Sequence, residues 1–392
     1  MIKGADRLEK MYFSPVRAVM EKVSKVIAEG HDVISFGVGE PDFDTPSRVK
    51  ADTIKAIENN YTHYAPNRGV LGLRKELSSY LEGLTGVSYD PASEIILTGG
   101  GAEAINNAFL AFINPGDEVI TFPPTFMNYE NMVYMAGGTL VEIPLTKEDN
   151  FQIDPARLEA AITDKTKMIV INNPSNPTGV VLTPEVLQQV ADIAIKHDLL
   201  VFSDEIYAEL IYDGMKFTSI ASLPGMKERT IMMTGFSKAF AMTGWRLGVL
   251  ASTSELISCM LKVHQYTTTC LPTFIQQGLV TAMNAPETIR EKNEMVEAFA
   301  RRRQMVLDGL DEIPDLSYTK PMGAFYIFVD VSATGMTGEE YADALLYDKY
   351  VAVVPGIKLG KECGNFIRIS YATSDEKIAE GLRRMKEFSL SR

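Results

Sequence analysis

Short runs rich in Ile, Val, Leu and Phe recur along the first two thirds of the chain, separated by amphipathic stretches. The runs at 94–97, 117–122, 168–171, 199–202 and 231–233 are bounded by turn residues and predict buried strands. Stretches at 47–60, 71–84 and 104–113 predict helices. Repeated alternation of strands and helices indicates an α/β fold with a mainly parallel sheet covered by helices on both faces.

The two ends of the chain depart from this pattern. Residues 1 to about 30 predict a polar arm and then a helix that starts near Ser14-Pro15, and a short strand is expected at 32–36. A long charged helix at 287–310 leads to strand signals at 324–329, 351–354 and 366–371. We therefore expect three parts. They are an N-terminal arm with part of a small domain (1–45), a large domain (46–286), and a linking helix with a C-terminal small domain (287–392).

Composition narrows the class of protein. A chain of 392 residues with 46% hydrophobic and 23% charged residues is typical of a globular protein with a sizeable core. The 38 basic and 51 acidic residues give a net charge of −13, which argues against a general nucleic-acid or anionic-membrane surface. A local basic pocket remains compatible with this balance.

Cysteine and histidine usage argues against a disulfide framework or a zinc site. The three cysteines form no Cys-x-x-Cys pair, and the four histidines do not cluster. Residues 1–10 are charged, and no apolar run approaches the ~20 residues of a membrane helix. We expect a cytoplasmic protein that holds no metal and inserts in no membrane.

The segment Ser237 to Gly248 carries the strongest chemical signal. An apolar run precedes it, which predicts that Lys238 is presented on a turn after a strand, where α/β enzymes place their chemistry. A lone lysine is far more often solvated at the surface. Here Ser237 stands beside it, Arg246 follows, and two glycines allow close backbone approach, so we interpret Lys238 as a lysine next to an anionic ligand.

This segment resembles the lysine motif of fold-type I pyridoxal-phosphate enzymes, specifically the aminotransferases similar to bacterial aspartate and aromatic aminotransferases. Two further motifs support the resemblance: Asn-Asn-Pro-Ser-Asn-Pro-Thr-Gly at 172–179 and Gly-Glu-Pro-Asp-Phe-Asp-Thr-Pro at 39–46. The motifs recur in family order from about Gly37 to Arg368. The resemblance implies a seven-stranded large-domain sheet between helices, a smaller α/β domain formed from both chain ends, and a homodimer with active sites at the subunit interface.

The resemblance also implies the roles around the cofactor, pyridoxal 5'-phosphate. Lys238 would hold the cofactor aldehyde as a Schiff base and then act as general base. Asp204 would bind the protonated ring nitrogen, and Asn176 and Tyr207 the phenolic oxygen, with Tyr207 placed on the same helical face as Asp204. Phe126 would stack on the ring. From the residues alone, Asp204 could equally cap a following helix, and Phe126 could be a core aromatic.

The remaining implied roles concern the cofactor phosphate and the substrate carboxylate. The expected phosphate ligands are the glycine turn with Gly101, Ala102 and Glu103, then Ser237 and Arg246, and Tyr64 from the neighbouring subunit. Gly39, Asn176 and Arg368 are expected to bind the substrate. Without the resemblance, the glycines would indicate a tight turn, Tyr64 a buried loop tyrosine, and Arg368 a solvent-facing residue of an edge strand.

We interpret the chain as an aminotransferase that moves an amino group from an L-amino acid to a 2-oxo acid by a ping-pong mechanism. An alternative with the same cofactor and fold is a β-lyase acting on cysteine S-conjugates, although the 39–46 motif favours transfer. A non-catalytic cofactor-sensing module is a further alternative, which the acidic balance disfavours. The chain lacks the first-strand fingerprint of NAD-binding proteins. The arm at 12–16, together with Phe126, is our hypothesis for the side-chain pocket.

Overall fold

The computed structural model describes residues 3–391; Met1, Ile2 and Arg392, the outer residues of the predicted arm and C-terminal domain, lie outside that range. Within it, the larger sheet has seven strands in the order β2-β8-β7-β6-β5-β3-β4. The strands are β2 (Ile95–Thr98), β3 (Glu118–Thr121), β4 (Thr139–Glu142), β5 (Thr166–Asn172), β6 (Leu200–Asp204), β7 (Thr230–Gly235) and β8 (Gly248–Ala251). β8 runs opposite to the other six strands, and the remaining pairs are parallel, which confirms the predicted mainly parallel sheet.

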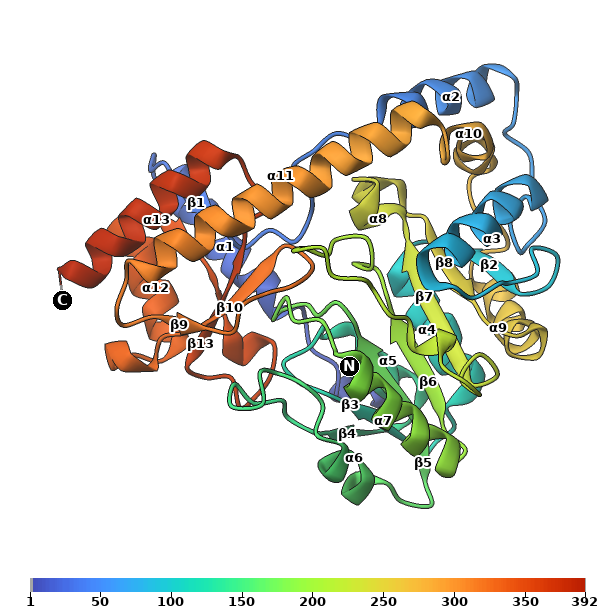
Figure 1. Ribbon diagram of the computed structural model, residues 1–392, viewed down its shortest axis with the longest axis horizontal. Coiled ribbons are helices and arrows are strands. Elements are labelled where there is room, and N and C mark those ends of the chain that lie inside the picture. Colours follow the sequence, from blue (N-terminus) through green and yellow to red (C-terminus); the bar gives the residue numbers. More distant parts are fainter. Residues whose placement is uncertain (1–2, 392) are drawn as a thin grey trace.

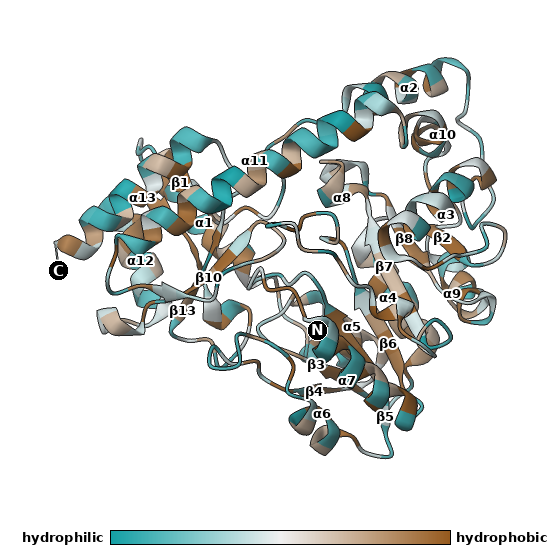
Figure 2. Ribbon diagram, in the orientation of Figure 1, coloured by the Kyte–Doolittle hydropathy of each residue, from teal (hydrophilic) through white to brown (hydrophobic). Residues whose placement is uncertain are grey.

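Both faces of this sheet are covered because successive strand residues point to opposite sides. Ile96 of β2 joins the core beneath one helical layer, whereas Ile95 and Leu97 join the core beneath the other. The first layer contains α4 (Gly101–Phe112), α5 (Asn128–Ala136) and α9 (Ser254–Thr267). The second contains α3 (Leu71–Thr85), α6 (Pro155–Ala161), α7 (Pro184–Lys196) and α10 (Thr273–Ala282). Figure 2 shows the apolar strands enclosed by helices whose outer surfaces are polar.

A second group of strands gathers the two ends of the chain. The described residues form a four-stranded sheet, β12-β13-β10-β9, and a parallel pair, β1-β11. Their bounds are β1 (Ile34–Ser35), β9 (Ser317–Tyr318), β10 (Tyr326–Asp330), β11 (Val351–Ala352), β12 (Val354–Pro355) and β13 (Phe366–Ser370). The accompanying helices are α1 (Pro15–Ala28), α12 (Gly338–Lys349) and α13 (Asp375–Leu390). The pairing of β1 with β11 therefore places the N-terminal segment within the C-terminal part of the fold.

The long helix α11 (Pro286–Asp311) connects the two groups of strands, as the sequence predicted. Figure 1 shows it running from α2 (Ser47–Glu58) and α10 across the molecule to α12 and α13. The loop 37–46 makes the same crossing, since it leaves β1 and ends where α2 begins. Arg302 of α11 holds this loop by donating to both carboxylate oxygens of Asp42, at 2.6 and 3.0 Å. The helix α11 thus holds the loop 37–46, which contains Gly37 and Gly39, in place.

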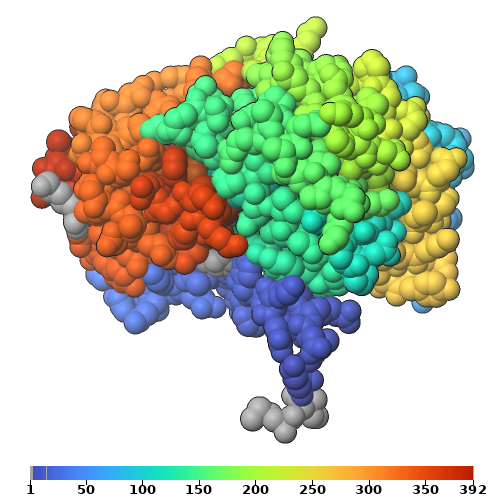
Figure 3. All heavy atoms as spheres, turned by 90° about the horizontal axis from the view of Figure 1, so that it is seen from below, coloured from blue at the N-terminus to red at the C-terminus, as the bar shows by residue number. Residues whose placement is uncertain are grey.

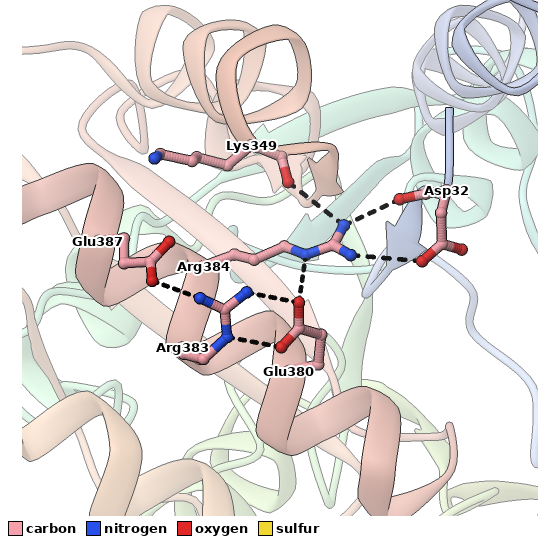
Figure 4. A network of polar contacts seen from close by, with 6 residues as sticks. All are labelled: Asp32, Lys349, Glu380, Arg383, Arg384 and Glu387. Carbon is pink, nitrogen blue, oxygen red and sulfur yellow. Dashed lines mark hydrogen bonds and ion pairs between the residues drawn. The ribbon is translucent and has the colours of Figure 1, made fainter. Parts of the chain in front are cut away.

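A network of ion pairs fixes β1 to the C-terminal helix (Figure 4). Arg384 of α13 donates to the carbonyl oxygen of Asp32 at 2.8 Å and lies 3.3 Å from its carboxylate. The same guanidinium binds Glu380 at 2.8 Å and the carbonyl oxygen of Lys349. One arginine therefore joins the segment before β1, the end of α12 and α13.

The strand predictions at the chain ends were too long. The expected strand at 32–36 is limited to Ile34–Ser35, and the run at 351–354 divides into β11 and β12. Val353 lies between these two short strands, which pair with different neighbours: β11 pairs with β1, whereas β12 pairs with β13. No helix within residues 3–391 combines the length and apolar composition that crossing a membrane requires.

Gly381 of α13 generates a stability prediction, because a Cβ there would lie 2.4 Å from Cζ of Phe36, the residue after β1. Gly381→Ala should lower the free energy of unfolding by about 1–3 kcal/mol, since overpacking outweighs the gain in helix propensity. Gly83→Ala on α3, where nothing lies within 4 Å, should raise it by about 0.5–1 kcal/mol. Urea unfolding of both variants provides the comparison, and shifts of the same sign would contradict the packing argument.

Candidate active site

A cavity of about 460 Å³ lies at the carboxyl ends of the parallel strands. Asn172 ends β5, Asp204 ends β6, and Lys238 follows β7 by three residues, so all three stand at the same edge of the sheet. Arg368 of β13 and Gly39 of the loop after β1 close the cavity from the smaller group of strands. The predicted site residues that line it are Gly39, Gly101, Ala102, Phe126, Asn176, Asp204, Tyr207, Ser237, Lys238, Arg246 and Arg368. Segments far apart in sequence therefore converge on one cavity.

Lys238 is the central amine of this cavity. It lies in the short helix α8 (Phe236–Ala239), directly after β7, and its Nζ donates to the carbonyl oxygen of Gly39 at 2.6 Å. Burial lowers the pKa of Lys238 to about 8; the charge of Glu40 opposes this shift, and that of Arg368 adds to it. A neutral amine, which is the nucleophilic and basic form, is therefore accessible near neutral pH.

Asp204 is a buried carboxyl group held in a fixed orientation. Its Oδ2 accepts a hydrogen bond from the Tyr129 hydroxyl at 2.5 Å, and its Oδ1 accepts from the backbone N–H of Ile206 at 3.1 Å. Burial raises the pKa of Asp204 to about 6, although both hydrogen bonds and the charge of Lys238 favour the ionised form. A cationic ligand group beside this carboxyl would favour ionisation further.

The predicted helix after Asp204 was wrong. Residues 206–209 form a turn, so Tyr207 is not placed by helical spacing and Asp204 caps no helix. The turn instead carries Tyr207 toward the smaller sheet, where its hydroxyl lies 3.0 Å from the hydroxyl of Tyr326. Tyr207 still lines the cavity, but tertiary packing against β10 decides its position.

Arg368 is almost completely buried, which excludes the alternative of a solvent-facing arginine on an edge strand. β13 lies between β12 and β10, and 4% of Arg368 is exposed. Its Nη1 donates to Oδ1 of Asn176 and its Nη2 to the carbonyl oxygen of Gly37, each at 3.0 Å. The guanidinium lies 4.6 Å from the centre of the Tyr326 ring, and its Nε has no partner within the described chain. Buried, fixed and incompletely paired, it suits a carboxylate ligand.

The opposite end of the cavity is suited to an anion. The N-terminus of α4 presents the backbone N–H groups of Gly101 and Ala102, and Ser237 and Arg246 line the same region. Gly100 precedes the helix with φ +84°, and a Cβ there would lie 2.6 Å from Nη2 of Arg246. The arginine therefore packs directly against a turn that only glycine can form.

Two predicted site residues lie outside the cavity lining. The Glu103 side chain turns away, toward the backbone N–H of Gly99 and toward His264, so only its backbone N–H belongs to the anion-binding end of α4. Tyr64 is 89% exposed on the surface. The predicted contact of Tyr64 with the site of a neighbouring subunit stays a prediction.

Sequence reasoning missed three residues that support the site. Asn172 accepts from the Asn176 backbone through Oδ1 at 2.8 Å, and the Asn-Asn-Pro motif could have identified it. Tyr129 binds Asp204, and its place one helical turn after Phe126 was a weak signal. Tyr326, which contacts both Tyr207 and Arg368, gave no signal because it reads as an ordinary strand residue.

Comparison with known proteins agrees with this geometry. The family model described as "Aminotransferase class I and II" matches residues 31–385. The chain is 46% identical to the putative aminotransferase YugH of Bacillus subtilis, over 94% of this chain and 95% of that protein. It is 42% identical to the aspartate aminotransferase of Pyrococcus abyssi, over 98% and 97% of the two chains. The solved aromatic aminotransferase of Pyrococcus horikoshii superimposes with a TM-score of 0.90 at 43% identity, covering 94% of this chain and 99% of that one.

The pKa of Lys238 generates a prediction for the cofactor-free protein. Because the amine reacts with aldehydes only when neutral, the rate of reaction with pyridoxal phosphate should rise with pH, with a midpoint near 8, and then level off. An ordinary lysine would keep gaining reactivity toward pH ~10.4. Stopped-flow absorbance measures the rate, with Lys238→Ala as the blank for surface lysines. A rate still climbing steeply above pH 9 would contradict the lowered pKa.

Proposed function

The chain belongs to the aminotransferase class I and II family, and we propose that the cavity around Lys238 performs its reaction on amino acids with uncharged, largely apolar side chains. The enzyme depends on pyridoxal phosphate and transfers amino groups between amino acids and 2-oxo acids. The buried arrangement of Lys238, Asp204 and Arg368 in one cavity is the observation that carries the residue roles proposed below.

The donors and acceptors of the cavity fit this cofactor. The N-terminus of α4, Ser237 and Arg246 would hold its phosphate, and Asp204 would hold its ring nitrogen, with Tyr129 fixing the carboxylate. Asn176 and Tyr207 would contact its phenolic oxygen, and Phe126 would cover one face of the ring. When bound, the cofactor supplies an aldehyde that combines with amines and a ring that accepts the electron pair released at the substrate Cα.

Lys238 and Arg368 would act on the substrate itself. Arg368 Nη1 and Nη2 contact Asn176 and Gly37, so the guanidinium is held in place before the α-carboxylate binds. The carboxylate would share Arg368 with Asn176, while Gly39 borders the same space. With its pKa near 8, Lys238 would remove the proton from Cα as a neutral amine and return it later in the reaction.

The substrate class follows from what remains of the cavity lining. The cavity has an apolar wall, formed by Val16, Ile105, Met127 and Leu359. Ser14 and Asn128 add neutral polar groups to the lining. Among the described residues, the cationic side chains lining the cavity are Lys238, Arg246 and Arg368, and each already has a proposed role.

The distal carboxylate of aspartate would therefore be desolvated without a cationic partner from this chain, which costs several kcal/mol. Sequence identity does not choose between substrates, because the aspartate and aromatic aminotransferases compared above are 42% and 43% identical to this chain. The cavity lining favours the aromatic or large aliphatic side chain.

We also propose that the enzyme is a homodimer. The N-terminal arm projects from the body of the molecule (Figure 3), and Phe13 in it is 91% exposed. Tyr64 and Tyr266 are 89% and 87% exposed, which is unusual for large aromatic side chains. A second subunit would cover such residues, with Tyr64 reaching the phosphate of the neighbouring cofactor.

The predicted parts 1–45, 46–286 and 287–392 remain our proposal for the domains, supported by the two separate sheets and by α11 between them. A cytoplasmic location is proposed from the three cysteines Cys259, Cys270 and Cys363, which are all free.

The amino-transfer half-reaction tests both the residue roles and the substrate class. Single amino acids are added to the holoenzyme, and the visible cofactor absorbance is followed until a 2-oxo acid restores it. We expect phenylalanine, methionine or leucine to react at least about tenfold faster than aspartate, because an unpaired carboxylate costs more than ~1.4 kcal/mol. Lys238→Ala should bind cofactor but show no turnover. Faster conversion of aspartate would overturn the substrate class alone, whereas turnover by Lys238→Ala would overturn the role of Lys238.

Arg368 has a separate test that uses a substrate without a carboxylate. Arg368→Ala should lower kcat/KM for phenylalanine about 10²–10³-fold, because it removes a buried charged partner worth ~2–5 kcal/mol. The same variant should change the much slower half-reaction of phenethylamine less than about threefold. Arg368→Lys is the matched control that keeps the charge but not the forked guanidinium. Its kcat/KM for phenylalanine should lie between the values of the wild type and of Arg368→Ala. Equal losses for both substrates would show that Arg368 only supports the fold.

A further inference from the structure

His264 of α9 is a fully buried histidine that does not line the cavity. None of it is exposed, and both ring nitrogens contact oxygen atoms. Nδ1 lies 2.6 Å from Oε1 of Glu103, and Nε2 lies 2.8 Å from the carbonyl oxygen of Asn67. A carbonyl oxygen can only accept, so Nε2 must donate to Asn67.

The Glu103 carboxylate acts as an acceptor on both of its oxygens. Oε2 accepts the backbone N–H of Gly99, and Oε1 also accepts from Asn107 at 3.1 Å. Burial alone would raise the pKa of Glu103, but the bonds from His264, Gly99 and Asn107 outweigh burial and hold the pKa below its ordinary value. Nε2 donates to a carbonyl oxygen, and the 2.6 Å contact between Nδ1 and Oε1 requires a proton between these two atoms, so the His264–Glu103 pair carries no net charge.

The Glu103 carboxylate restrains the glycine turn at 99–101. Gly99, Gly100 and Gly101 have no side chains to restrain them, and a Cβ on Gly99 would lie 2.8 Å from Oε2 of Glu103. Glycine at position 99 allows the Glu103 carboxylate to approach the backbone closely, but glycine also gives the backbone high conformational freedom. The bond from Gly99 N–H to Glu103 therefore restrains the segment that presents backbone N–H groups to the cavity.

The same carboxylate creates an electrostatic problem. Glu103 lies in the first turn of α4, whose N-terminus faces the anion-binding end of the cavity. A buried negative charge at this position would repel a phosphate group. The N-terminus of α4 attracts a phosphate strongly only where that negative charge is balanced. The contact with His264 supplies that balance, because the pair as a whole carries no net charge.

We propose that His264 and Glu103 are a positioning pair that holds the 99–101 turn in its phosphate-binding shape and cancels the charge of Glu103 beside that phosphate. The proposal rests on the proposed function, in that the bound group carries a phosphate at α4. Through Asn67, three residues after Tyr64, the pair also joins the turn to the loop proposed to reach the neighbouring subunit. His264 does not line the cavity, so it would act through Glu103 and not on substrate or cofactor directly.

Selective loss of phosphate recognition tests the pair. Pyridoxal phosphate and pyridoxal, which lacks the phosphate, are titrated into cofactor-free protein, with the fluorescence of the single tryptophan, Trp245, as the signal. His264→Gln should weaken binding of pyridoxal phosphate about tenfold or more and binding of pyridoxal less than about threefold. The matched control is His197→Gln, which removes a histidine that lies 2.7 Å from Glu159 at a distance from the cavity, and it should change neither affinity.

Two substitutions at Glu103 distinguish the loss of the hydrogen bond to Gly99 from the loss of the negative charge. They also test the pair if His264→Gln does not fold. Glu103→Gln retains an acceptor for Gly99 and removes the negative charge, so it should keep affinity for pyridoxal phosphate within about threefold. Glu103→Ala removes the acceptor and should weaken that affinity about tenfold. Similar behaviour of the two variants, or equal losses of both ligands in His264→Gln, would overturn the pair. A wild type that binds pyridoxal as tightly as pyridoxal phosphate would instead overturn the phosphate site itself.

Discussion

Burial of several opposite charges in one cavity is the constraint on which this structure depends. Lys238, Asp204 and Arg368 would each be costly to bury alone, yet they share a single lining and partly balance one another. Burial moves the pKa of Lys238 down and that of Asp204 up, so both groups change protonation much closer to neutral pH than they would in water. Such shifted pKa values are typical of groups that exchange protons in an active site.

The cavity requires both groups of strands. The parallel strands of the large sheet bring Asn172, Asp204 and Lys238 to one edge, but Arg368 comes from β13 and the carbonyl oxygens of Gly37 and Gly39 come from the loop after β1. That loop keeps its place because β1 is anchored to the C-terminal part of the fold by strand pairing and by Arg384. Contacts far from the cavity therefore help to set the distance between Lys238 and Arg368.

The end of the cavity at α4 is different, since it presents mostly backbone N–H groups, which suit an anion. Glycines allow Arg246 to approach the turn closely, and this freedom has to be restrained from outside. We propose that Glu103 and the buried His264 provide the restraint as a pair without net charge. The site thus combines a rigid, charge-balanced support with a surface of N–H groups that is free to bind a ligand.

The sequence by itself determined the elements and most of the chemistry. Apolar runs located five of the seven strands of the large sheet but not β4 or β8, and helical patterns located α2, α3, α4 and α11. The motif around Lys238 with Asn176 and Arg368 indicated the family, because local motifs record residue types that a reaction requires. Only the tertiary structure decided that Tyr207 lies in a turn, that Arg368 is buried on an inner strand, and that Tyr129, Tyr326 and His264 support the site. Those roles arise from contacts between residues that lie dozens to hundreds of positions apart, and no pattern of neighbouring residues encodes such contacts.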